Sequence, residues 1–295
     1  MRQRPVSSVP VARPRHSVRP RPTSLGPTRV GLTTAATLML ALIALPVAAL
    51  VWRALQGLDA GTWPVLRGAV LDAVRLSLAT TAVSMVWIVL LGMPLAYVLA
   101  RTSFPLKRLV NLLIELPIVM PPVVAGLALL MAFGRRGLLG SMLAGVGLSL
   151  PFTRTAIVMA QVFVAAPFFI RAAQLRFAAL PRELEEAAAL DGAGGLRLFW
   201  RITLPLSRRA LLTGLMLSWS RALGEFGATI LFAGNLRGRT QTMPLLVYGA
   251  LEQDLNAALW TGVILIALAV LTLGGIQLLE HLFTDDGEDD PLARL

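Results

Sequence analysis

The sequence predicts an all-α polytopic membrane protein with about six transmembrane helices. Of its 295 residues, 56% are hydrophobic and only 15% are charged, a composition too apolar for a soluble globular domain. The charged residues cluster between long uncharged runs, and several of these runs are long enough to cross a bilayer. Composition therefore fixes the fold class before any motif is considered.

The chain begins with a basic segment at residues 1–29. This segment holds seven arginines, six prolines and no acidic residue, so it cannot build a core and we expect a disordered cytoplasmic tail. Residues 30–52 form the first uncharged apolar run. A cleaved signal peptide would have a shorter apolar region nearer the start, so this run is predicted to be an uncleaved span.

Five more spans complete a predicted transmembrane domain over residues 30–283. They are expected at residues 74–100, 109–133, 156–170, 210–233 and 257–283. The third span carries Pro117, Pro121 and Pro122, which interrupt backbone hydrogen bonding and are tolerated only where neighbours or a cavity satisfy the carbonyls. Residues 284–295 form an acidic tail that should be solvated.

The distribution of arginines predicts the orientation. If the N-terminus lies inside, the inner segments hold 18 of the 27 Lys and Arg residues, and the outer segments hold 8. Because cytoplasmic loops carry an excess of positive charge, we expect both termini inside. The long loop between the fourth and fifth spans then lies in the cytoplasm.

That loop contains a polar stretch at residues 183–205, ELEEAAALDGAGGLRLFWRITLP. Its first half is rich in strong helix formers, and glycines then break the helix. Residues 196–202 can form a second short helical turn, which Pro205 is expected to end. A helix–glycine–helix too polar for lipid is typical of a docking element.

Several kinds of chemistry are excluded or disfavoured. The chain has no cysteine and only His16 and His281, so we expect no metal site and no catalytic site. Its single lysine, Lys107, is not preceded by the glycines of a phosphate-binding loop, so any ATP must be bound by another subunit. The net charge of +11 could suggest nucleic acid, but arginines beside membrane spans explain it better.

Charged residues inside the predicted spans are candidates for function. Arg221 and Glu225 are four residues apart, so they share one helix face and can pair. The pair could line an anion path or gate, or it could fix helix packing. Glu115 could be a polar anchor at the inner end of the third span or a path residue.

Two further features could belong to the path. Pro121 and Pro122 could form a gate hinge, or a kink that serves packing alone. Asn235 lies in the polar outer segment 234–242, whose arginines, amides and hydroxyls could attract an oxyanion or an acidic partner surface. A plain solvated loop is the alternative.

The polar stretch has a recognisable spacing. Glu186-Ala187-Ala188, then Gly192, then residues 202–205 in the sequence I-T-L-P, resembles the EAA loop of bacterial ABC-importer permeases. The resemblance implies the type I ABC importer permease fold, with this loop as the coupling helix that enters a groove of the ATPase subunit. The residues it implicates in coupling are Glu186, Ala187, Ala188, Asp191, Gly192, Ile202, Leu204 and Pro205.

Within that superfamily, the chain looks most like the molybdate permeases. Residues 100–130, 133–140 and 220–248 carry this similarity, and the resemblance covers a core of about residues 65–282. Sulfate/thiosulfate permeases share a looser version, typically with Glu-Tyr-Gly in place of the Glu-Phe-Gly that begins at Glu225. The resemblance implies a permease subunit that imports molybdate or a similar oxyanion across the bacterial cytoplasmic membrane.

The implied partners are a second copy of this chain, two cytoplasmic ATPase subunits that hold ATP and Mg²⁺, and a periplasmic or lipid-anchored solute-binding protein. This chain itself is expected to bind no cofactor. Three alternatives stay open: a sulfate/thiosulfate or tungstate permease of the same type, an ATP-independent secondary transporter, and a membrane scaffold whose loop recruits a partner. Inverted repeats or a relay of ionisable residues would favour the secondary transporter.

Overall fold

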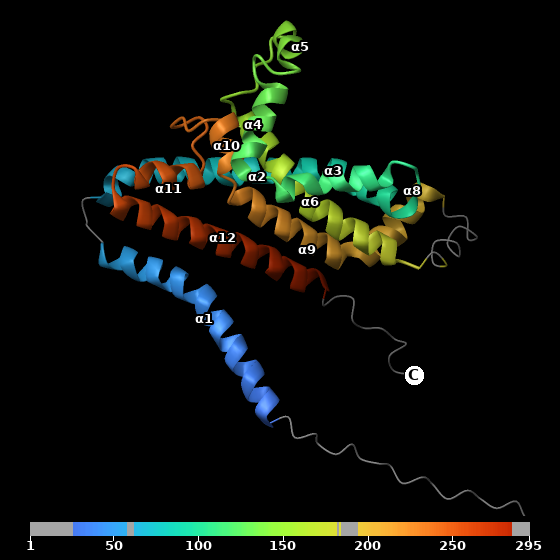
Figure 1. Ribbon diagram of the computed structural model, residues 1–295, viewed down its shortest axis with the longest axis horizontal. Helices are drawn as coiled ribbons and strands as arrows, with labels where there is room; N and C mark the ends of the chain where they lie inside the picture. The colour runs from blue at the N-terminus through green and yellow to red at the C-terminus, as the bar shows by residue number, and fades with distance from the viewer. Residues whose placement is uncertain (1–25, 58–61, 182, 184–193, 285–295) are drawn as a thin grey trace, which may run out of the picture. The chain divides into compact units, whose positions relative to one another are not determined.

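The computed structural model describes residues 26–57, 62–181, 183 and 194–284. Every regular element within these residues is a helix, which confirms the predicted all-α class (Figure 1). The acidic tail after residue 284, most of the basic tail and most of the first half of the polar stretch lie outside the described residues. The chain divides into two compact units, residues 1–49 and 50–295.

The first apolar run forms α1, Gly26–Gln56, with Pro46 inside the helix. Large apolar side chains along it, such as Leu38, Leu42 and Leu45, are exposed. An apolar surface of this kind suits a lipid environment, where no water has to be excluded from it.

The core of the second unit is built by α2, Thr62–Arg101, α6, Arg154–Ala179, and α9, Leu204–Leu223. Small residues let these helices approach closely, since a Cβ added to Gly214 of α9 would lie 2.8 Å from the Cβ of Ala172 in α6. Ser218 adds a hydrogen bond to the Ala165 carbonyl oxygen at 2.9 Å. Both α2 and α6 extend beyond their predicted spans because the charged residues at their ends end the apolar run but not the helix.

The predicted third span is not one helix. It consists of α3, Lys107–Val119, and α4, Pro122–Phe133, whose axes differ by 120°. The break has a simple cause: Pro121 and Pro122 donate no backbone hydrogen bond, and Met120 before them adopts an extended conformation (φ −67°, ψ 131°). Pro117, by contrast, is accommodated inside α3.

The fifth predicted span, residues 210–233, is also interrupted. It is formed by the end of α9 and by α10, Gly227–Phe232, separated at residues 224–226. In Figure 1, α4 points sharply away from the axis of α3, and α10 lies beside α4. Ala125 of α4 and Phe232 of α10 are fully buried in a small core with Ala160 of α6.

The contact between α4 and α10 depends on glycine. A Cβ added to Gly126 would lie 2.9 Å from both the Cα and the carbonyl oxygen of Ala228. We therefore expect Gly126→Ala to lower the free energy of unfolding by about 1–3 kcal/mol, because the backbone of α10 would have to move. The control is Gly68→Ala in α2, where an added Cβ meets nothing within 4 Å. Denaturation of both variants in mixed micelles tests this, and equal stabilities would contradict the packing.

The second half of the polar stretch continues directly into the membrane domain. It forms α8, Gly195–Leu198, then a π-helical turn η1, Phe199–Thr203, and then α9. The expectation that Pro205 ends this helix is wrong. Pro205 lies in the first turn of α9, where its missing N–H and fixed φ are tolerated.

The remaining helices in the described part of the chain are the short α5, Gly140–Gly145, and α11, Met243–Leu251, and the long α12, Leu255–Thr284. The hydroxyl of Ser77 in α2 accepts a hydrogen bond from the N–H of Met243 at 2.8 Å, which ties α11 to α2. The indole of Trp219 donates to Thr272 at 3.1 Å and joins α9 to α12.

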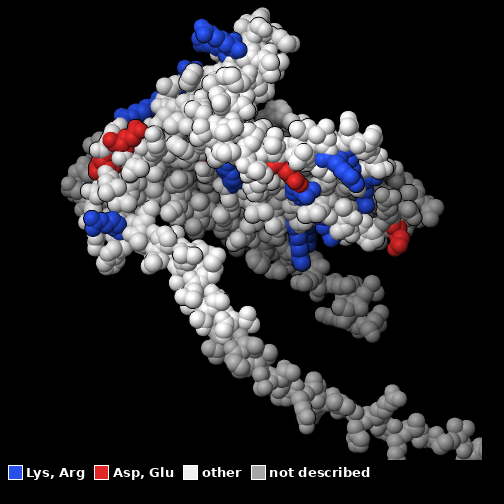
Figure 2. Space-filling view, viewed as in Figure 1, with Lys and Arg blue, Asp and Glu red and all other residues white. Residues whose placement is uncertain are grey.

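Within the described residues, four helices are long and apolar enough to cross a membrane, and a fifth span results if the bent pair α3 and α4 counts as one. The fifth predicted span, residues 210–233, does not qualify by these measures, because α9 carries Arg208, Arg209 and Arg221 and ends at Leu223. Most of the surface in Figure 2 is uncharged, and the charged side chains form separate patches.

Candidate functional site

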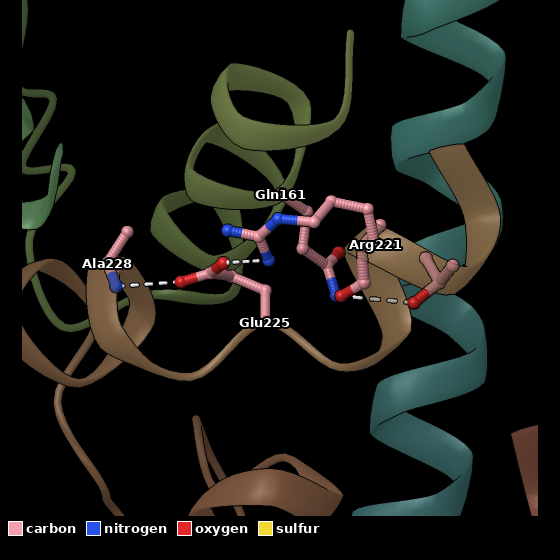
Figure 3. A network of polar contacts seen from close by, with 6 residues as sticks. Gln161, Arg221, Glu225 and Ala228 are labelled. Carbon is pink, nitrogen blue, oxygen red and sulfur yellow. Dashed lines mark hydrogen bonds and ion pairs between the residues drawn. The ribbon is translucent and has the colours of Figure 1, made fainter. Parts of the chain in front are cut away.

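A buried carboxylate marks the break between α9 and α10. Glu225 is only 2% exposed. Its Oε2 lies 2.5 Å from Nη1 of Arg221, one turn earlier on α9, and its Oε1 accepts a hydrogen bond from the N–H of Ala228 at 2.7 Å (Figure 3). The same carboxylate therefore neutralises a guanidinium and satisfies a free donor at the start of α10.

The pairing of Arg221 with Glu225 agrees with their four-residue spacing, but their contribution to an anion path stays a prediction. The Arg221 side chain is 29% exposed, whereas that of Glu225 is 1% exposed. Arg221 thus reaches the surface of this subunit, whereas Glu225 is buried inside it. A charge held in this way is costly to leave unpaired.

A glutamine next to the pair links three helices. Nε2 of Gln161 in α6 donates to the carbonyl oxygen of Ala222 at 3.1 Å and to Oγ1 of Thr81 in α2 at 3.2 Å, and its Oε1 accepts from Ser84 of α2 at 2.9 Å. Gln161 is 2% exposed. It therefore gives a second donor to a carbonyl oxygen at the end of α9, which also accepts from the N–H of Glu225 at 3.1 Å.

Sequence reasoning missed Gln161. The available signal was a single amide side chain in the middle of the apolar run of the fourth predicted span. Polar side chains at such depth commonly bond across helices. Its partners lie 61–80 residues away along the chain, so only the fold identifies them.

Removal of this amide gives a direct test. We expect Gln161→Met, which keeps the length of the side chain, to lower the free energy of unfolding by about 1–2 kcal/mol, because its hydrogen bonds to Ala222, Thr81 and Ser84 would be lost. Gln253→Met is the matched control, since Gln253 is exposed after α11. If both variants unfold at the same denaturant concentration, the network does not hold the helices together.

The bend in the third span packs against this break. A Cβ added to Gly227 would lie 2.5 Å from Cβ of Pro122, so the first turn of α4 lies directly on the first turn of α10. Pro121 precedes that turn as the residue that caps α4. The fold thus brings Pro122 and the ion pair into one neighbourhood, although about 100 residues separate them in the chain.

Phe226 connects the break to α11. Its ring centroid lies 5.1 Å from that of Tyr248. The hydroxyl of Tyr248 donates to the Glu252 side chain, and this hydrogen bond, together with the negative charge of Glu252, raises the pKa of Tyr248 above its ordinary value of 10.0. Asn235 also bonds to α11, because its Nδ2 donates to the carbonyl oxygen of Leu245 at 3.2 Å. This hydrogen bond joins Asn235 to α11 and not to the Arg221–Glu225 pair.

Glu115 forms a second, more exposed pair. Its Oε1 lies 2.9 Å from Nη2 of Arg171 in α6, and both side chains are about two-fifths exposed. Nearby, Nε2 of Gln174 donates to Asn111 Oδ1 at 3.2 Å. These contacts join α3 to α6, as expected of a polar anchor, and leave a role in the path untested.

Five predicted coupling residues, Glu186, Ala187, Ala188, Asp191 and Gly192, lie outside the described residues. Of the other three, Leu204 packs against the core of α2, α6 and α9, Ile202 is half-buried and Pro205 is exposed. The larger anchor is Phe199, which sequence reasoning did not single out.

Phe199 of η1 sits among aromatic rings of the membrane helices. Its ring centroid lies 5.2 Å from Tyr97 of α2 and 6.1 Å from Phe177 of α6, both edge to face. Arg176 of α6 adds two hydrogen bonds to the carbonyl oxygen of Leu206, at 2.7 and 3.2 Å. The end of the polar stretch is therefore firmly attached to α2 and α6.

A family model described as the binding-protein-dependent transport system inner membrane component matches residues 88–281. The chain belongs to this family. It is the inner membrane permease component of a bacterial ABC importer and a multi-pass membrane protein.

The curated relatives of this permease include molybdenum and sulfate transport permeases. It is 42% identical over 213 residues to the molybdenum transport system permease protein ModB of Mycobacterium tuberculosis, which covers 72% of this chain and 81% of the relative. It is 38% identical over 207 residues to the sulfate transport system permease protein CysW of Synechococcus elongatus, which covers 70% of each chain.

The fold agrees with solved permeases. A chain of the bacterial alginate ABC transporter, crystallised with its alginate-bound periplasmic protein, aligns with a TM-score of 0.71 over 90% of this permease and 98% of that chain. The sequence identity of that pair is 18%, so the likeness shows the fold alone. It confirms the predicted importer permease fold.

Proposed function

We propose that this permease imports molybdate, or a similar tetrahedral oxyanion, and that a separate ATPase subunit drives it through residues 183–205. The observation that carries the proposal is the 42% identity to a molybdenum transport permease over most of both chains. The EAA spacing from Glu186 to Pro205 supports the coupling. ATP and Mg²⁺ would be held by the partner, and a second copy of this chain would complete the translocation unit.

The attachment of η1 suggests how coupling works. The ATPase would move the segment around Glu186, and the continuous run from α8 through η1 into α9 would carry this motion into the membrane. The edge-to-face contacts of Phe199 would pass it on to α2 and α6. A partner can drive such a switch only if it binds the two states with different affinity.

We also propose that the break between α9 and α10 lies beside the gate. Glu225 and Arg221 would hold one arrangement of the break, and the bend at Pro121 and Pro122 would move with α10, against which it packs. Asn235 would link this motion to α11. A fixed packing pair is the alternative role of Arg221 and Glu225.

Sulfate is a second candidate cargo, because the chain is 38% identical to a sulfate permease. Uptake by the assembled importer separates the two. Membrane vesicles that contain all subunits should accumulate labelled molybdate, and excess unlabelled molybdate should compete better than sulfate. Stronger competition by sulfate would assign the sulfate function instead. Uptake of neither anion would overturn the proposed cargo.

A further inference from the structure

A hollow of about 850 Å³ lies between α2, the start of α6 and the outer segment 234–242. Its lining includes three arginines from these three parts of the fold: Arg75, Arg154 and Arg237. The sequence placed Arg237 in the polar outer segment 234–242, but it gave no reason to connect Arg75 or Arg154 with it. Only folding brings residues so far apart in the chain to one cavity.

The charge inside this hollow is unbalanced. Asp72 is the one acidic residue in the lining, so the lining carries a net charge of +2. No ion pair joins Asp72 to any of the three arginines in the part of the chain that the structure describes. Guanidinium groups gathered without matching carboxylates repel one another, and a bound anion would remove that cost.

A hydrogen bond holds one of the three arginines of the hollow in place. Nη2 of Arg154 donates to the carbonyl oxygen of Gly238 at 3.5 Å, which connects the first residue of α6 with the outer segment. Gly238 has a φ of +70°, a conformation that suits glycine, and it places this turn beside Arg237. The hollow also includes Thr155 in the first turn of the 26-residue α6, where the helix dipole is positive.

We propose that this hollow is a binding site for a divalent tetrahedral oxyanion. A dianion would neutralise the net charge of the lining, and the planar guanidinium groups can each offer two N–H donors to an oxyanion. The site rests on the proposed function, since an importer of such anions has to receive them at the outer end of the membrane domain. The site goes beyond the proposed function because it names the residues that would contact the anion first.

Chemical protection of the arginines tests the site. The permease with its ATPase, but without the binding protein, is placed in nanodiscs and treated with phenylglyoxal, which modifies accessible arginines. Sodium molybdate is present before and during this treatment at constant ionic strength, with sodium chloride as the control. Mass spectrometry should show that molybdate protects Arg75, Arg154 and Arg237 together. Arg239, two residues from Arg237 but outside the lining, should stay unprotected.

A pair of matched variants sharpens the result. Arg237→Gln should raise the molybdate concentration that half-protects Arg75 and Arg154 about threefold, the effect of one partly solvated charge, whereas Arg239→Gln should leave it unchanged. Protection of all arginines alike, equal protection by chloride, or none, would overturn the site. The site would also be overturned if Arg237→Gln weakened capture of the binding protein but left the protection of Arg75 and Arg154 by molybdate unchanged. The hollow would then be a protein docking surface. Uptake of molybdate by the wild type, measured separately, tells whether the proposed function itself fails.

Discussion

Arg221→Ala is expected to lower the free energy of unfolding of this permease by about 3 kcal/mol. The substitution leaves the Glu225 carboxylate buried with its charge uncompensated and only the N–H of Ala228 as a partner. The value is taken at the lower end of the range for buried pairs, because the Arg221 side chain is 29% exposed. Denaturation in mixed micelles measures it, and Arg208→Ala, at an exposed position of the same helix, is the control.

A double variant identifies the cause. Adding Glu225→Gln to Arg221→Ala removes the stranded charge and should restore most of the lost stability. No recovery would show that the loss arises elsewhere. Uptake by the recovered protein then separates the two roles of the pair: normal transport means that it only fixes packing, and abolished transport by a stable protein means that it belongs to the gate.

Gly192→Val is expected to abolish oxyanion uptake while the protein stays in the membrane at its normal level. The EAA pattern assigns Gly192 the turn that lets the coupling helix enter the ATPase groove, and a β-branched side chain would block both the turn and the approach. The defect should also abolish stimulation of ATP hydrolysis by the binding protein.

Gly195→Val is the matched control for this coupling variant. Gly195 begins α8 three residues later, and an added Cβ there meets nothing within 4 Å. Its uptake should stay close to that of the wild type. Normal uptake by Gly192→Val itself would remove Gly192 from the coupling role, and equal loss in both variants would indicate a general defect of the segment.

Hydrophobic runs were enough to predict the helical class and the approximate positions of α1, α2, α6 and α12. They could not show that residues 109–133 bend by 120°, because apolar residues continue on both sides of that break. They also could not show that α9 stops at Leu223, because one charged pair in an apolar run is equally compatible with an unbroken helix. The prolines at 121 and 122 indicated an interruption but not its angle. The bent arrangement places Gly126 of α4 against Ala228 and Gly227 of α10 against Pro122, and these contacts join residues about 100 positions apart.

The residues of the candidate site also differ in whether the sequence alone could predict their contacts. The Arg221–Glu225 pair lies within one helical turn, so spacing alone predicted it. Gln161, Phe199 and the arginine-lined hollow depend on residues brought together from different helices, and no local pattern predicts such contacts. Pro205 was misread because a proline in the first turn of a helix looks, in sequence, the same as one that ends the preceding helix.

Uptake by the complete importer tests the central proposal most directly. Proteoliposomes would hold the permease with its ATPase subunit, ATP and Mg²⁺ inside, and the binding protein with labelled molybdate outside. The proposal predicts accumulation that requires both hydrolysable ATP and the binding protein, and that is lost with Gly192→Val. Accumulation without ATP, driven by an ion gradient alone, would contradict it and would assign the chain to ATP-independent transport.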